Sequence, residues 1–70
     1  MDSRQYAKFQ EVVSVMEENE EDLTDFESDF LKSMQKKIKD YEEDSSLTSK
    51  QAEILVKIAK KLDIDAEILL

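Results

Sequence analysis

The sequence contains no cysteine, histidine, glycine, proline or tryptophan. Without cysteine the chain can form neither a disulfide nor a thiolate metal site, and without histidine it lacks the commonest general acid or base near neutral pH. Without glycine it has no loop suited to cradling a phosphate group, and tight turns between strands are disfavoured. These absences argue against an enzyme, against a bound cofactor or metal, and against a sheet-based fold.

Long apolar segments are also missing. No run approaches the roughly 18 apolar residues that a membrane-spanning helix needs, and the opening residues MDSRQYAKFQ lack the apolar core of a signal peptide. A small secreted domain without disulfides would be unusual. We therefore expect a soluble cytoplasmic protein that makes no contact with a membrane.

The composition that remains is typical of short amphipathic helices. Charged residues make up 40% of the 70 residues and hydrophobic residues another 40%. The high net charge of -8 would also suit a disordered chain, but the apolar residues are periodic rather than scattered, which favours a fold. A chain of this length forms a single domain, residues 1–70, and buries only about 60% of its unfolded surface, so a partner protein or a homodimer would add to its stability.

Three pairs of residues have the spacing of a capping box, in which the residue before a helix and a Gln or Glu three positions later bond each other's backbone amides. The pairs are Asp2 with Gln5, Thr24 with Glu27, and Thr48 with Gln51. Behind each pair, apolar residues recur at steps of three and four, the period of one helical face. The pattern predicts helices over about residues 3–18, 25–43 and 49–62.

The predicted fold is all-α: a small three-helix bundle with a short C-terminal helical turn. The short loop around Ser45 predicts that the second and third helices form an antiparallel hairpin, with the first packed across it. Asn19 is expected to end the first helix in the left-handed conformation. The last residues, DIDAEILL, are expected to dock on the bundle or on a second copy, with Asp63 or Asp65 as the cap. The expected core residues are Phe9, Val13, Phe26, Phe30, Met34, Ile38, Leu55, Ile58 and Leu62.

The charge is unevenly distributed along the chain. The first 30 residues carry ten acidic side chains against two basic ones, whereas residues 31–70 carry eight of each, so the whole net charge of -8 lies in the first part. Such asymmetry can mark an interaction surface, and a solvated face that keeps the protein soluble is the alternative. The candidate partner-binding residues are Glu17, Glu18, Glu20, Glu21, Asp22, Asp25 and Asp29.

These carboxylates have other interpretations. Glycosidase chemistry needs two carboxyl groups facing each other across a cleft, for which a three-helix domain has little room. A calcium loop of the EF-hand type needs a glycine and alternating ligands, which this stretch lacks. A third interpretation is that the acidic face imitates a nucleic acid and occupies the basic groove of a nucleic-acid-binding protein.

A basic patch is the alternative interaction site. If the second and third helices are antiparallel, the lysines of one lie level with those of the other, and the candidates are Lys32, Lys36, Lys57, Lys60 and Lys61. However, the single arginine, Arg4, belongs to the first helix, and the overall negative field repels phosphate. We therefore do not expect direct binding of nucleic acid.

Two stretches resemble known families. Leu47 to Ala59 is similar to the opening of LuxR-type response-regulator DNA-binding domains, with Leu47, Thr48, Lys50, Gln51, Glu53, Ile54, Leu55, Ile58 and Ala59 matching an L-T-x-[RK]-[EQ]-x-E-[IV]-L-x-x-I-A pattern. That family reads DNA with a later recognition helix, for which residues 63–70 are too few. We therefore expect this match to reflect a capped amphipathic helix rather than DNA binding.

Residues 23–62 resemble a helical hairpin, [WF]-E-x-x-F-[LI]-x-S followed by L-[ST]-x-[KR]-Q-x-x-[IL]-L-x-x-I, that recurs in phage-encoded accessory proteins of DNA metabolism. The matching residues are Phe26, Glu27, Phe30, Leu31 and Ser33, and then Leu47, Thr48, Lys50, Gln51, Ile54 or Leu55, and Ile58. The resemblance implies a phage accessory factor in the host cytoplasm that binds a component of DNA metabolism or a host enzyme. Together the observations predict a non-enzymatic, acidic protein-interaction module, with a nucleic-acid-mimicking inhibitor as the alternative.

Overall fold

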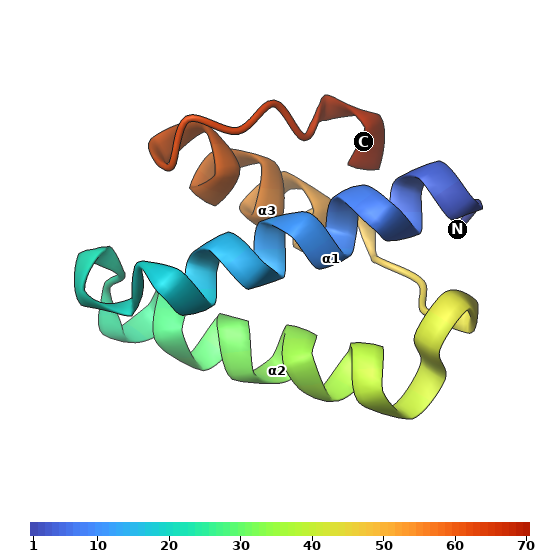
Figure 1. The fold of residues 1–70 in the computed structure, drawn as a ribbon, viewed down its shortest axis with the longest axis horizontal. Coiled ribbons are helices and arrows are strands. Elements are labelled where there is room, and N and C mark those ends of the chain that lie inside the picture. Colours follow the sequence, from blue (N-terminus) through green and yellow to red (C-terminus); the bar gives the residue numbers. More distant parts are fainter.

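The computed structural model describes residues 1–70 and contains three α-helices and no strand (Figure 1). The helices are α1 (Ser3–Glu18), α2 (Asp25–Tyr41) and α3 (Ser49–Lys61), and short 3-10 turns follow them at Glu20–Asp22, Glu42–Asp44 and Glu67–Leu69. The predicted all-α three-helix bundle is confirmed, together with its C-terminal turn. No helix combines the length and the apolar character needed to cross a bilayer.

All three predicted capping boxes are formed, which explains why the helices begin where the sequence predicts. The caps Asp2, Thr24 and Thr48 accept from the amides of Gln5, Glu27 and Gln51 at 2.8, 3.2 and 3.1 Å. In return, the side chains of Gln5, Glu27 and Gln51 accept from the backbone amides of the three caps. The backbone N–H groups of the first turn have no acceptor within the helix. Because each cap supplies one, it stabilises its helix by about 1 kcal/mol.

α1 and α2 lie side by side and antiparallel, and α3 starts behind α1 and runs above it in this view toward the end where α1 and α2 are joined (Figure 1). Two contacts fix the register of α2 and α3: the Lys61 ammonium lies 2.7 Å from the Glu27 carboxylate, and the Lys37 ammonium donates to the side-chain oxygen of Gln51 at 2.9 Å. The end of α3 therefore lies beside the start of α2, which is the predicted antiparallel arrangement. The most extensive contact between helix backbones is nevertheless that of α1 with α2.

The core is formed by one face of each helix and by the C-terminal segment. Of the nine expected core residues, Phe9, Val13, Met34, Leu55 and Ile58 are buried, and Phe30, Ile38 and Leu62 are half-buried against them. The other buried apolar residues are Val12, Met16, Leu31, Ala52, Val56, Ala59, Ala66 and Leu69.

The prediction that Phe26 belongs to the core is wrong, because its side chain is 62% exposed. On α2 it is Leu31 and Met34 that lie in the core, with side chains only 2% and 1% exposed. With about 100° of rotation per residue, Phe26 lies some 140° around the helix from Leu31. Tyr41, the last residue of α2, is also exposed.

The C-terminal segment docks on its own chain. Asp63 adopts a φ of 63° after α3, and the amides of Asp63 and Ile64 donate back to the carbonyls of Lys60 and Ala59 at 3.1 and 2.7 Å. These two bonds form a Schellman motif with Asp63 in the left-handed position. The segment then runs back to the N-terminal end of α1, where the Gln5 amide donates to the Ile68 carbonyl at 3.1 Å. The expectation that this segment docks on the bundle is confirmed.

α1 ends at Glu18, as predicted, but the conformation of the next residue differs from the prediction. Asn19 has a φ of -124°, so the expected left-handed conformation there is wrong. Its side-chain amide instead donates to the Val15 carbonyl at 2.8 Å, which satisfies one of the free carbonyls of the last turn. A positive φ occurs instead at Glu42, where α2 ends at Tyr41 rather than at residue 43.

Candidate interaction surfaces

The acidic candidates gather at the end of the molecule where α1 passes into α2 (Figure 1). All seven side chains are exposed, and none of them takes part in an ion pair: Glu17, Glu18, Glu20, Glu21, Asp22, Asp25 and Asp29. No group of three acidic side chains is placed to hold a metal ion. We call these seven residues the acidic end, and it presents separate, uncompensated surface charges.

The exposed Phe26 lies within the same stretch of chain. Its ring stacks on that of Phe30, with the ring centroids 6.3 Å apart and the planes inclined by 21°. Phe30 is half-buried against the core, so it supports Phe26 from beneath. The stacking therefore holds the exposed Phe26 ring in place on the surface of α2.

The structure divides the predicted basic patch. Lys61 pairs with Glu27, and Lys60 lies 4.0 Å from the Glu67 carboxylate. Lys57 has no ion pair. Although antiparallel packing puts Lys32 and Lys36 level with α3, they lie about 140° and 100° around α2 from Lys37, the lysine that reaches α3. The five lysines therefore do not form one patch.

A different set of residues shares the outer side of the α2–α3 pair. On α2, Phe26 and Phe30 lie within about 20° of Lys37 around the helix, and Lys37 bonds to α3. On α3, Ile54, Lys50 and Lys57 lie within about 40° of Lys61, which bonds to α2. We call this the α2–α3 face: Phe26, Phe30, Lys37, Lys50, Ile54, Lys57 and Lys61.

Sequence reasoning did not connect Lys37 and Lys50 with the aromatic residues of this face. The spacing of Lys37 from Phe26 and Phe30, eleven and seven residues, places all three on one side of a helix, which is a signal present in the sequence. What the sequence could not supply was the rotation of α2 and α3 about their axes. That rotation decides which lysines stand beside the aromatic residues.

Glu27 links this face to the cap of α2. The hydrogen bond from the Lys61 ammonium, followed by that from the backbone amide of Thr24, holds the pKa of Glu27 below its ordinary value of 4.5. The negative charge is therefore favoured in the folded protein. Because the pKa is lowered on folding, the resulting stability is present above the ordinary pKa and is lost as the pH falls through the folded value.

Replacing Glu27 with glutamine tests this link. The glutamine can still accept from the Thr24 amide but loses the charge that pairs with Lys61, so the free energy of unfolding at pH 7 should fall by about 0.5–1 kcal/mol. The difference from the parent protein should disappear as the pH falls through the lowered pKa of Glu27. Urea denaturation over a series of pH values from 7 downward measures this. Glu53→Gln removes the same charge from an exposed residue of α3 without an ion pair and should change little. A loss at Glu27 that persists at low pH would contradict the electrostatic cause.

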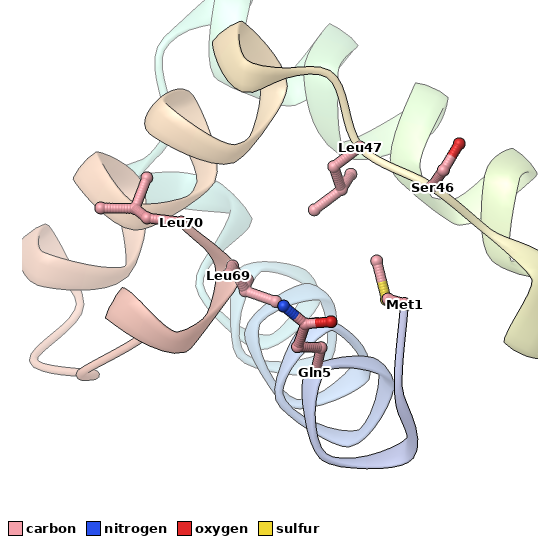
Figure 2. Close-up of a pocket in the computed structure, with 6 residues that line it drawn as sticks. All are labelled: Met1, Gln5, Ser46, Leu47, Leu69 and Leu70. Atoms are coloured by element: carbon pink, nitrogen blue, oxygen red, sulfur yellow. The ribbon is translucent and has the colours of Figure 1, made fainter.

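A small hollow lies where the two ends of the chain meet. It has a volume of about 270 Å³ and is bordered by the first turn of α1, the loop before α3 and the C-terminal turn (Figure 2). Figure 2 shows Met1, Gln5 and Leu47 around it, with Leu69 and Leu70 on the C-terminal side. None of the side chains that line the hollow is ionisable.

Comparison with known protein families, with curated proteins and with solved structures finds no match to this chain. Its function is therefore inferred from the acidic end and the α2–α3 face.

Proposed function

We propose that this protein is a non-enzymatic interaction module that binds another protein through the α2–α3 face. The observation that supports this most directly is the exposure of Phe26 in a domain whose Phe9 is fully buried. An aromatic ring held in place on a surface offers a large apolar area at little entropic cost, and such rings are typical anchors of protein interfaces. The lysines of the α2–α3 face supply a polar rim.

The resemblance of residues 23–62 to hairpin modules of phage-encoded accessory proteins suggests where the partner is to be sought. The resembling stretch contains α2, α3 and the whole α2–α3 face. A component of DNA metabolism or a host enzyme is the proposed partner class. In such a setting the protein works in the host cytoplasm.

Capture of the partner by immobilised protein tests this function. Phe26→Ala should abolish capture, because it removes the anchor without opening the core. The matched control is Leu70→Ala, which truncates a side chain that is 69% exposed and lies outside the face. A protein retained by the parent chain and by Leu70→Ala but lost from Phe26→Ala supports the proposal. Equal capture by all three chains would refute it.

A second candidate function is that of an acidic inhibitor that mimics nucleic acid. It is favoured by the seven unpaired, exposed carboxylates of the acidic end. In this case the combined change Glu20→Gln, Glu21→Gln and Asp22→Asn should abolish capture while Phe26→Ala preserves it. Duplex DNA added in excess should also displace the partner, because both would occupy the same basic groove.

A further inference from the structure

From the chemistry of the α2–α3 face we infer that it receives an acidic amphipathic helix of the partner. This inference rests on the proposed function and names the kind of segment that the face recognises. Three features of the face support it: its apolar strip, its lysines and its length.

The apolar strip runs between the two helices. Phe26 is exposed, and Phe30 and Ile54 are half-buried, so each offers apolar surface to a partner. Phe30 and Ile54 also pack against the core from outside, which fixes their positions. A partner helix with apolar residues at steps of three and four would bury this strip along its own apolar stripe.

Lysines flank the strip, and three of the four have no carboxylate partner. Lys50 and Lys57 form no ion pair, and the Lys37 ammonium bonds only to the Ser46 carbonyl and the Gln51 side chain at 2.6 and 2.9 Å. Lys61 is the one lysine of the face that is paired with a carboxylate. Apart from Glu27, which pairs with Lys61, and from Asp25 and Asp29 next to the aromatic residues, the face is locally basic, although the protein as a whole carries a net charge of -8. Charge complementarity therefore requires acidic residues beside the apolar stripe of the partner.

The same face is poorly suited to nucleic acid. The single arginine, Arg4, lies on α1 and outside the face. The phosphate backbone of a nucleic acid would extend beyond the face, where the overall negative charge of the protein repels it. A short helix can instead place all of its acidic residues next to the lysines. Between Phe26 and Lys37, α2 rises about 16 Å, which corresponds to three turns of helix. A helix of about 12 residues matches that length.

Designed peptides test the inference directly. The probe is an amphipathic peptide of about 12 residues with leucines on one face and glutamates beside them, and its counterpart carries lysine in place of every glutamate. Amide chemical shifts of nitrogen-15-labelled protein report where each binds. We expect the acidic peptide to shift residues of α2 and α3 on the face, and the basic counterpart to bind there at least about tenfold more weakly.

Two charge-reversed variants sharpen the test. Lys50→Glu with Lys57→Glu should weaken binding of the acidic peptide by about tenfold. Lys32→Glu with Lys39→Glu makes the same change in net charge, from -8 to -12, on another side of α2 and should leave binding almost unchanged. An equal loss of peptide binding in the two double variants would show that only net charge matters and would overturn the inference.

Other outcomes separate this inference from the proposed function. If the acidic peptide does not bind while Phe26→Ala still loses the natural partner, the partner segment has a different chemistry and only the inference fails. If oligothymidylate shifts the same residues more strongly than the peptide, the face binds single-stranded nucleic acid and the inference is wrong. If a second copy covers the face, sedimentation shows a dimer that Phe26→Ala dissociates, and this also overturns it.

Discussion

Replacing Phe9 with alanine is expected to lower the free energy of unfolding by about 3–5 kcal/mol, the largest single effect that the structure predicts. The Phe9 ring is 0% exposed and lies within the core cluster. Removing it takes away its own burial and leaves a cavity that the neighbouring side chains can fill only in part. A domain of 70 residues is stable by only about 4–10 kcal/mol, so the variant should be close to unfolding at 37 °C.

Phe26→Ala is the matched control, since it is the same chemical change on a side chain that is 62% exposed. It should change the free energy of unfolding by no more than about 0.5 kcal/mol, because surface substitutions leave no cavity. Urea denaturation followed by far-ultraviolet circular dichroism measures both variants. If Phe26→Ala destabilised the protein as much as Phe9→Ala, Phe26 would be a structural residue, and the proposed interface would lose its main support.

The helices could be predicted from the sequence because their signals are local. A capping box needs only residues three positions apart, and Thr24 with Glu27 or Thr48 with Gln51 forms it whatever the rest of the chain does. The stripe of α3 is equally local, and its Leu55 and Ile58 are buried as expected. Interactions within one or two helical turns therefore explain why the helices were predicted correctly.

The errors concern features that depend on how the helices pack. Phe26 and Leu31 both belong to apolar patterns along α2, and only packing against α1 and α3 decides that Leu31 turns inward. Chain reversal without glycine is a similar case, because either Asn19 or another residue can provide the bend. The structure assigns positive φ to Glu42 and Asp63 instead. The α2–α3 face was missed for the same reason, as it combines residues from two helices.

The acidic end and the α2–α3 face have opposite charge and meet at Phe26, which lies directly after Asp25 of the acidic end. Added salt weakens the binding of charged partners to either surface, because both consist of exposed charges. Salt dependence alone therefore cannot distinguish a partner held by the acidic end from one held by the face. Charge reversal at Lys50 and Lys57 and neutralisation at Glu20 to Asp22 act on one surface each and do distinguish them.

Replacing Glu42 with glycine is expected to stabilise the protein. Glu42 has φ 46° and ψ -126°, a conformation that glycine adopts freely and that a residue with a side chain adopts at a cost of about 1–3 kcal/mol. The Glu42 amide still donates to the Ile38 carbonyl, and its carbonyl accepts from the Ser45 amide, so the backbone is held in this conformation. After subtraction of about 0.5–1 kcal/mol for the greater freedom of glycine in the unfolded chain, a net gain of about 0–2.5 kcal/mol remains, with about 1 kcal/mol in the middle of this range.

Thermal unfolding measures this gain as a rise in Tm of about 5 °C. Two variants separate the backbone effect from the loss of a carboxylate at the end of α2, where the helix dipole disfavours negative charge. Glu42→Ala removes the same charge but keeps a Cβ atom, so it should recover little of the gain. Glu43→Gly introduces glycine where φ is not positive and should lower Tm. A Glu42→Ala variant as stable as Glu42→Gly would assign the effect to charge and would show that the chain turns from α2 toward α3 without strain.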